Sequence, residues 1–561
     1  MVGRRRPGRY LRRRSQALRW PTGEYGDELG RTCSASSTGS AECKRLQPIV
    51  PSSAGAVNGW RGRTLDRSGI SWILAGKGLP AQVERKVPPM HPTRRQILGA
   101  GLGGVVAAGI GVPALASSAR LASGVAPEQA VRARIRPPRF RDAWFPITPY
   151  GATPEDATAG INAAIRACHD SGGGHVVVPP GVWQTGAIQL LSRVDLHLQR
   201  GSTLRFSTDP VDYLPVVRTR WQSVEVYNYS SLIRAEGQTD IGITGAGVLD
   251  GAGDNEHWWY LIGSGQYGWH TGLPNQREDW GELERMNNEQ VPVEERVFGA
   301  GHYLRPSFIQ PFRCTNVLIE GVTVLNSPMW TIHPLECHNV TVQGVTVRNL
   351  GPNGDGCDPE SCTDVLIRDC TFETHDDCIA IKSGRDADGR RLGLPSRGIL
   401  IEDCTFVSGG AAVAIGSEMS GGIEDVWVRR LQMPADPAAE EAYIQWVLCV
   451  KSTSTRGGYV RNVDLSGVDS RAWMYRPLEI TFSYQGGGDQ SLFPDVRDIR
   501  FDRVRVARAE RAYRMVGAQT QRIRSVAITN SQFDQVAAEA VVQYADDVTI
   551  RNVWIAGTRV G

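Results

Sequence analysis

The chain has 561 residues, with 62 Lys and Arg against 59 Asp and Glu. The resulting net charge of +3 argues against a general nucleic-acid binder, whose domain is usually strongly basic. The length allows more than one domain, but a solenoid also reaches this size as one domain because it grows by adding coils.

The first predicted element is an export signal that begins at Met90. Arg94 and Arg95 form a twin arginine ahead of an apolar, Gly-rich stretch over 97–116, which ends in the small residues ALASSA. This order resembles a twin-arginine signal peptide, which we assign to 90–124. The stretch is nearly long enough to span a membrane, but its weak hydrophobicity favours a cleaved signal over an anchor. The sequence therefore predicts export to the periplasm or beyond, without stable membrane insertion.

The segments on either side of this signal carry no strong pattern. Residues 1–89 have no apolar periodicity. We interpret them as an extension ahead of a true start at Met90, or as a disordered basic leader. Residues 125–144 are rich in Pro and Arg and are predicted to be a linker, so the folded domain is predicted over 145–561.

Eleven cysteines suggest disulfides at first, but their positions favour buried thiols. Cys337, Cys362, Cys370 and Cys404 lie in or beside strand-like runs, where a small apolar side chain packs well. No pair of CxxC units is present, so a zinc site is not predicted. We expect no cofactor and no bound metal.

A helix is predicted at the start of the folded domain, within Thr153 to Ser171. Ile161, Ala164, Ile165 and Cys168 follow a helical spacing. Because the ends of a solenoid must be closed, we expect this helix to cover the first coil.

A short repeat then fills most of the chain. Each copy is an alternating apolar run followed by a polar or Gly turn; examples are NVLIEGVTVLNS (316–327), NVTVQGVTVRNL (339–350), DVLIRDCTFET (364–374) and GILIEDCTFVS (398–408). A period in the twenties with short strands is typical of a parallel β-helix. The Leu and Asn framework that a leucine-rich repeat requires is absent from this sequence. A β-sandwich would not show so regular a repeat. The predicted fold is all-β, a single-stranded right-handed parallel β-helix with an N-terminal capping helix. The non-repeating insert over 256–305 is expected to form loops over one face.

Three carboxylates stand out within this repeat. Asp355 lies in NGDGCDPESC, and Asp376 and Asp377 lie in HDDCIAIKSG, about one coil later. Neighbouring coils are about 4.7–4.9 Å apart, so the three acids are expected to gather on one face. Such crowding raises the pKa of at least one acid, which suits a general acid beside a general base. In isolation, NGDG is most typical of a turn, and the pair Asp376-Asp377 is more typical of a solvated corner or part of a calcium site.

These blocks resemble glycoside hydrolase family 28, the polygalacturonase family, over about 145–555. NGDGCDPESC is similar to the family's NTDG block and HDDCIAIKSG to its DDC block. GSEMSGGI (416–423), RGGYVRNV (456–463) and SPMWTIHP (327–334) are further matches. The resemblance implies an inverting hydrolase that acts on pectic polysaccharides or oligosaccharides. Separately from the resemblance, we expect a monomer.

The resemblance also implies roles for single residues. Asp376 is the expected general acid, and Asp355 and Asp377 are expected to hold and deprotonate the attacking water. In inverting enzymes the carboxyl groups are about 6.5–9.5 Å apart. Asn353 is expected to support the cluster, and Lys451 and Tyr484 to bind substrate.

Two positions depart from the family pattern. The family's Gly-His-Gly block reads SGGAAVAIGSE, so its histidine falls on Gly410 or Ala411, and its Arg-x-Lys block begins at Cys449. Cysteine cannot clamp a carboxylate as arginine does. Three interpretations follow: a different glycoside, including one with rhamnose or a neutral sugar; a slow polygalacturonase in which His375 or Lys382 compensates; or a binding protein without turnover.

Two other functions remain open from the sequence. A β-helix polysaccharide lyase would need calcium and a basic Arg or Lys. A non-catalytic solenoid would bind sugars through exposed aromatics such as Trp258, Trp259 and Trp330, which could equally be core residues. His333 is expected to be packed rather than catalytic.

Overall fold

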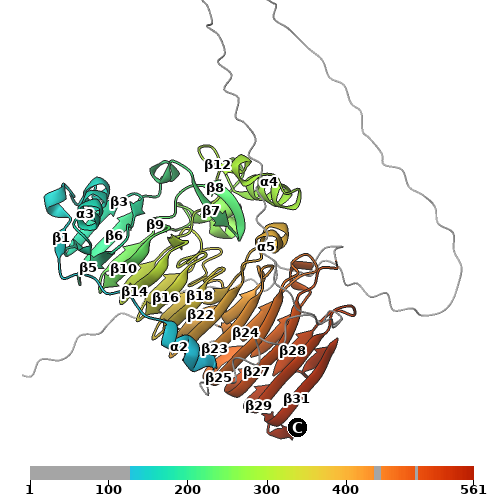
Figure 1. Ribbon diagram of the computed structural model, residues 1–561. Helices are drawn as coiled ribbons and strands as arrows, with labels where there is room; N and C mark the ends of the chain where they lie inside the picture. The colour runs from blue at the N-terminus through green and yellow to red at the C-terminus, as the bar shows by residue number, and fades with distance from the viewer. Residues whose placement is uncertain (1–126, 435–443, 487–490) are drawn as a thin grey trace, which may run out of the picture. The chain divides into compact units, whose positions relative to one another are not determined.

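Short parallel strands stack through the chain in sequence order, as Figure 1 shows. This computed structural model describes residues 127–434, 444–486 and 491–561. The predicted extension and signal peptide lie outside the described residues. None of the helices in the described part is long and apolar enough to cross a membrane.

The strands form three parallel stacks, which confirms the predicted parallel β-helix. The first stack contains β1 (Trp144–Pro146), β2 (Gly174–Val178), β5 (Val194–Leu198), β10 (Thr239–Gly245), β14 (Thr315–Glu320), β16 (His338–Gln343), β18 (Thr363–Arg368), β21 (Ser396–Glu402), β23 (Ile423–Met433), β25 (Tyr459–Met474), β27 (Asp495–Ala509), β29 (Ile523–Val536) and β31 (Ala545–Ile555). The second contains β3 (Gly181–Thr185), β6 (Ser202–Phe206), β11 (Val248–Asp250), β15 (Thr323–Leu325), β17 (Thr346–Asn349), β19 (Thr371–Thr374) and the start of β22 (Thr405–Gly416). The third contains β4 (Ile188–Gln189), β9 (Ile233–Glu236), β13 (Ile309–Phe312), β20 (Ile379–Ile381), the end of β22, β24 (Ile444–Lys451), β26 (Leu478–Thr481), β28 (Tyr513–Val516) and β30 (Val541–Gln543).

The apolar positions of the repeat form the core between these sheets. Val317, Val340, Val365 and Ile399 are register partners in successive coils, and all are buried. Each coil thus covers the apolar face of its neighbour, which no coil could bury alone.

The Asn or Asp that opens each repeat has a backbone reason. Asp240, Asn316, Asn339, Asp364 and Asp425 precede the equivalent strand residue in their coils, and each adopts a left-handed φ between 56° and 59°. Asn and Asp tolerate this conformation better than most residues. Their side chains also join the coils: Asn316 donates to Asp240 at 2.7 Å and Asn339 donates to Asn316 at 2.6 Å.

The predicted cap is the helix α3 (Thr158–Asp170), at the N-terminal end of the stack in Figure 1. Ile161, Ala164, Ile165 and Cys168 are buried in the main core, which confirms the helical interpretation. Asp156 lies one residue before the N-cap Ala157, and its Oδ1 accepts the backbone N–H of Thr158, the first helical residue, at 2.9 Å.

Part of the segment predicted to be a linker is folded against the solenoid. The helix α2 (Pro127–Arg134) packs Val131 against Leu400 and Trp427. Arg134 also forms two hydrogen bonds with Asp364, at 2.6 and 2.8 Å. The Pro/Arg-rich composition of this segment did not predict the contact, because the contacting residues are 230 or more positions away in the sequence.

The described cysteines are free and buried, as predicted: Cys168, Cys314, Cys337, Cys357, Cys362, Cys370, Cys378, Cys404 and Cys449.

Insertions at the turns cover one part of the solenoid. The predicted insert contains a helix, α4 (Arg277–Asn288), and the strand β12 (Val297–Phe298) beside short 3₁₀ turns. The hairpin β7 (Val217–Trp221) and β8 (Val224–Asn228) pairs with β12. The helix α5 (Asp386–Leu392) follows β20 and contacts both α4 and β8. The terminal strand β32 (Thr558–Val560) folds back on β31.

Candidate active site

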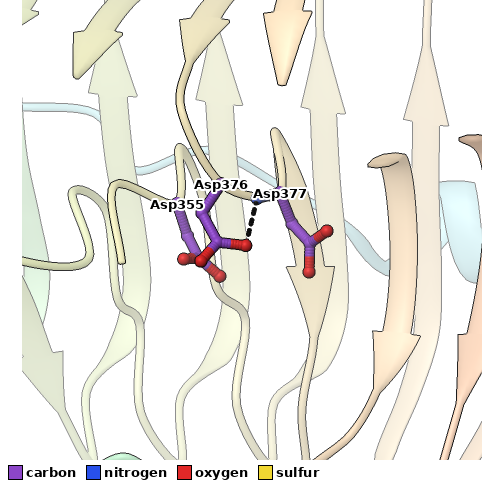
Figure 2. Close-up of side chains that lie close together, drawn as sticks. All are labelled: Asp355, Asp376 and Asp377. Atoms are coloured by element: carbon purple, nitrogen blue, oxygen red, sulfur yellow. Dashed lines mark hydrogen bonds between the residues drawn. The ribbon is translucent and has the colours of Figure 1, made fainter. Parts of the chain in front are cut away.

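The three predicted aspartates meet at the turns between the second and third stacks. Asp355 follows β17, and Asp376 and Asp377 follow β19 one coil later. The backbone N–H of Gly356 donates to the carbonyl of Asp377 at 3.0 Å, which fixes these two coils in register. Figure 2 shows the three side chains projecting to the same side of the sheet.

The carboxylates form a tight cluster. Each offers an oxygen within 4.8 Å of one from the other two. Asp377 is held at both oxygens: Oδ1 accepts the backbone N–H of Ala411 at 3.0 Å, and Oδ2 contacts Lys451 Nζ at 2.6 Å. Asp376 is less buried, and its Oδ1 accepts the backbone N–H of Asp377 at 2.9 Å. The cluster thus has one anchored member and one that an incoming substrate can reach.

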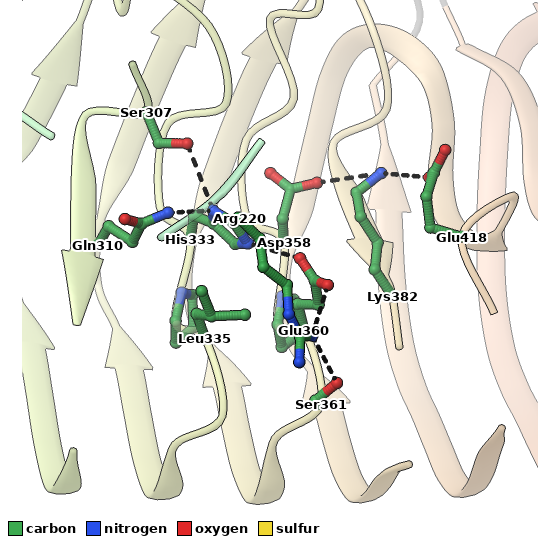
Figure 3. Close-up of polar contacts among 12 residues, drawn as sticks. Arg220, Ser307, Gln310, His333, Leu335, Asp358, Glu360, Ser361, Lys382 and Glu418 are labelled. Carbon is green, nitrogen blue, oxygen red and sulfur yellow. Dashed lines mark hydrogen bonds and ion pairs between the residues drawn. The ribbon is translucent and has the colours of Figure 1, made fainter. Parts of the chain in front are cut away.

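A buried lysine connects this cluster to two further carboxylates. Lys382 Nζ lies 3.4 Å from Asp355, 3.5 Å from Asp358 and 3.5 Å from Glu418. It also lies 4.3 Å from the centre of the Trp330 ring. Figure 3 shows Lys382 between Asp358 and Glu418. The amine therefore neutralises several acids at once, which lets them stay close together.

Burial and charge set the protonation of these groups. Burial, together with Asp358 and Asp376, raises the pKa of Asp355 well above its usual range. Burial also raises the pKa of Asp377, although Lys451 opposes the rise. Burial works against ionisation of Glu418 as well, but Lys382, Arg456 and Arg385 together lower its pKa to about 2. The site can therefore hold protonated and ionised carboxyls side by side, as acid/base catalysis requires.

The residues predicted to support this cluster lie around it. Asn353, Lys451 and Tyr484 line the same pocket. Asn353 accepts a hydrogen bond from the buried Arg305 at 2.8 Å, and Lys451 Nζ lies 5.0 Å from the Tyr484 ring centre. Lys451 lowers the pKa of Tyr484, but burial together with Asp376 and Asp377 outweighs this effect and raises the pKa to about 12, so the phenol stays neutral.

His375 and Lys382, proposed from the sequence as compensating residues, occupy different settings. His375 is half-buried and contacts the hydroxyl of Tyr267 in the insert, at 3.0 Å from Nε2. Burial lowers the pKa of His375, which favours the neutral ring. Lys382 lies beside the cluster and contacts one of its three aspartates, Asp355, at 3.4 Å.

The two departures from the family pattern have structural counterparts. A Cβ on Gly410 would lie 2.9 Å from Asp377 Oδ1, so the missing side chain leaves room for that carboxylate. Cys449 belongs to a small buried cluster with Ala380, Ala411 and Ala414, against which Trp446 packs. The position of the family's arginine is therefore apolar and lies outside the pocket lining.

The aromatic residues are mostly structural. Trp258 and Trp330 are buried, which contradicts their interpretation as exposed aromatics that bind sugars. Trp259 is half-buried, and its indole N–H donates to the carbonyl of Ser327 at 2.9 Å. His333 is fully buried and contacts Glu360 at 2.9 Å, so it is packed as predicted (Figure 3).

Sequence reasoning missed several residues of the site. Gln222, Arg385 and Glu418 line the pocket, and Asp358 lies behind it. Glu418 lies inside the block GSEMSGGI, and Arg385 directly follows HDDCIAIKSG. The family resemblance of these two blocks could therefore have pointed to both residues. Gln222 comes from a distant hairpin, and nothing in its local sequence points to the site.

The aspartate cluster also has the geometry to hold a cation, because its three oxygens lie within 4.8 Å. Lys451 and Lys382 already contact Asp377 and Asp355. Their ammonium groups supply the positive charge that a metal would bring, so the residues favour a metal-independent site.

Comparison with known proteins identifies relatives of this chain. The family model described as "Glycosyl hydrolases family 28" matches residues 300–521. A probable polygalacturonase of Vitis vinifera is 30% identical over 372 residues, which cover 64% of this chain and 66% of that protein. The chain spans between about half and two thirds of the length of the first curated relatives that it matches.

Solved structures agree with this match. An exopolygalacturonase from Thermotoga maritima is 39% identical, with a TM-score of 0.73, over 77% of this chain and 96% of that chain. A polygalacturonase from Erwinia carotovora shares the fold at 22% identity and a TM-score of 0.54, over 74% of this chain and 98% of that chain.

Proposed function

The chain belongs to glycosyl hydrolases family 28, and we propose that it hydrolyses glycosidic bonds between uronate residues of pectic polysaccharides or oligosaccharides. The observation that carries this proposal is the cluster of Asp355, Asp376 and Asp377 at one edge of the pocket, with oxygens within 4.8 Å. Glycoside hydrolysis needs a carboxylic acid and a carboxylate at such a position.

The geometry supports a division of roles among the three acids. Asp376 is the least buried, so it is placed to protonate the glycosidic oxygen of the leaving sugar. Asp355 and Asp377 are buried behind it, and they would orient a water molecule and accept its proton. The anchored carboxylate of Asp377 favours precise positioning of that water.

The lyase alternative is less consistent with these residues. A lyase needs a basic side chain that can lose its proton, and the lysines of the pocket are poorly suited to that. Carboxylates raise the pKa of both Lys382 and Lys451 even though burial opposes the rise. Both amines therefore stay charged, and hydrolysis is favoured.

The short distances within the aspartate cluster bear on whether the reaction inverts or retains the anomeric configuration. One oxygen from each of the three aspartates lies within 4.8 Å of one from each of the others, whereas the two carboxyl groups of typical inverting enzymes are about 6.5–9.5 Å apart. The distance between these oxygens is therefore shorter than the carboxyl separation expected for an inverting enzyme. We propose inversion, because Asp355 and Asp377 would hold the same water molecule. A water shared by two neighbouring acids requires a shorter carboxyl separation than a water that lies between two widely separated groups.

Activity on polygalacturonate tests the proposed reaction. The wild-type protein is expected to release reducing ends without a new ultraviolet absorbance, since hydrolysis forms no double bond. Asp376→Asn is expected to lower kcat by at least about a hundredfold, the lower end of what general acid catalysis contributes. Absence of reducing ends from galacturonan and rhamnogalacturonan alike would refute the proposal, and an absorbing product would indicate a lyase.

We also propose that cleavage starts from chain ends. The solved relative at 39% identity is an exopolygalacturonase. In this chain, the hairpin residue Gln222 and Arg385 beside the insert line the catalytic pocket, which supports a closed end. Digestion is expected to release only short products while viscosity falls slowly; a rapid early loss of viscosity would show internal cleavage.

Export and a monomeric state are further proposals. The twin arginine of Arg94 and Arg95 supports export. Replacing both arginines with lysine is expected to retain the protein in the cytoplasm, as measured by cell fractionation. Light scattering of the exported protein is expected to give the mass of one chain.

A further inference from the structure

The charges that line the pocket leave one cation with spare donor capacity. Lys451 is 2.6 Å from Asp377, and Lys382 is shared among three carboxylates. In Arg385, by contrast, Nη1 makes only a 3.4 Å hydrogen bond to Gln222 and lies 3.5 Å from Glu418. Its buried Nε has no hydrogen-bond partner and lies 3.6 Å from Asp386. A buried guanidinium N–H without a hydrogen-bond acceptor costs free energy, unless a bound ligand supplies the acceptor.

Arg385 is also held in a fixed orientation. Its Nη2 pairs with Glu284 of α4 at 2.5 Å, and its guanidinium carbon lies 4.4 Å from the centre of the Trp280 ring. Its backbone N–H donates to the carbonyl of Ser223 at 3.2 Å. The insert and the β7–β8 hairpin thus immobilise the arginine before any ligand arrives, which reduces the entropy lost on binding.

The neighbouring hairpin turn carries backbone strain. Gln222 and Ser223 connect the paired residues Trp221 and Val224, and their φ angles are 42° and 66°. Two-residue turns of this kind prefer Asn-Gly, and a left-handed residue other than Gly costs about 1 kcal/mol. Such strain concentrates at functional sites. Here it places the Gln222 amide at the pocket beside Arg385.

We propose that Arg385 and Gln222, which line the catalytic pocket, bind the carboxylate of a uronate residue. This inference rests on the proposed function, since it names the residues that select an acidic sugar. The guanidinium supplies a charge-assisted hydrogen bond and the Gln222 amide a neutral one. Together they substitute for the arginine that the family carries at the position of Cys449.

Binding without turnover tests this proposal separately from hydrolysis. In an Asp376→Asn background, calorimetry measures the Kd of digalacturonate and of its carboxyl-reduced, neutral counterpart. Arg385→Gln is expected to weaken binding of the acid by at least about tenfold, as expected for a charge-assisted contact, and binding of the neutral sugar by less than about twofold. Arg385→Lys, which keeps the charge but not the fork, should fall between.

The matched control is Arg391→Gln, at an exposed arginine of α5, the helix that directly follows Arg385; Arg391 pairs with Glu225 and Asp388. It is expected to leave both Kd values unchanged. Equal loss for the two sugars, or no loss for the acid, would overturn the proposal. If Arg385→Gln does not fold, unweakened binding of the acid by Arg385→Lys would overturn it. A failure to hydrolyse polygalacturonate with intact selection for the acid would instead count against the proposed reaction alone.

Discussion

At the scale of single residues, Gly410 shows how this site differs from the family pattern. The neighbouring backbone N–H of Ala411 and the amine of Lys451 hold Asp377 where the family has a histidine nearby. A Cβ at Gly410 would lie 2.9 Å from Asp377 Oδ1. The absence of a side chain is therefore a requirement of this arrangement of the carboxylate.

Gly410→Ala tests that requirement. Because Asp377 is held at both oxygens, the added methyl group forces it out of position, and kcat is expected to fall about tenfold or more with a smaller change in KM. Steady-state kinetics on galacturonate oligomers measures both. An unchanged kcat would show that Asp377 needs no such room, and a matched thermal unfolding curve excludes a general loss of structure.

The buried Asp358 predicts a pH effect on stability. Burial raises its pKa to about 7, although Lys382 opposes the rise, whereas an unfolded Asp titrates near about 3.9. Between these values the folded state binds a proton that the unfolded state does not. The contribution of Asp358 to the stability is therefore fully present below about pH 3.9 and is lost as the pH rises through about 7.

Asp358→Asn removes this titration. The difference in Tm, variant minus wild type, is expected to become more positive between about pH 4.5 and pH 8. Thermal unfolding in a series of buffers measures it. A difference that is constant or decreases over this range would contradict the predicted protonation of Asp358.

At the scale of elements, the first residue of each repeat connects one coil to the next. Asn339 has a φ of 57°. Its amide donates to Asn316 and to the carbonyl of Arg136, both at 2.6 Å, and accepts the N–H of Arg136 at 2.8 Å. One side chain thus connects its coil to the Asn316 side chain of the preceding coil and to the backbone of the segment that follows α2.

Two substitutions separate these contributions. Asn339→Ala loses the hydrogen bonds and adopts an unfavourable φ, so it is expected to destabilise the fold by about 2–4 kcal/mol. Asn339→Gly loses the same bonds without the backbone penalty and is expected to cost about 1 kcal/mol less. Denaturant unfolding measures both, and a glycine variant no more stable than the alanine variant would contradict the backbone part of this explanation.

The elements also show what the sequence could predict. The solenoid, its capping helix and the meeting of Asp355 with Asp376 and Asp377 follow from a regular period, because equivalent residues in neighbouring coils must stack. The contacts of α2 and the entry of Gln222 into the pocket do not follow from it. They depend on insertions and on partners far away in the sequence, for which a period carries no information.

At the scale of the whole molecule, the structure explains how so many buried charges coexist. The carboxylates of the pocket face two lysines and an arginine, and the adjoining network contains Arg220 with Glu336 and Glu360. Buried ions remain stable only when paired. The solenoid supplies the pairs by stacking acids and bases in successive coils, and this places an acid/base cluster on a rigid sheet.

The anomer formed first from a defined galacturonate oligomer tests the central claim most directly. If Asp376 protonates the leaving oxygen while Asp355 and Asp377 direct one water to the opposite face, an α-linked oligomer should give the β anomer first, with the α anomer appearing only by mutarotation. Proton NMR during early hydrolysis follows both. First formation of the α anomer, or no cleavage at all, would contradict the proposed roles of the three aspartates.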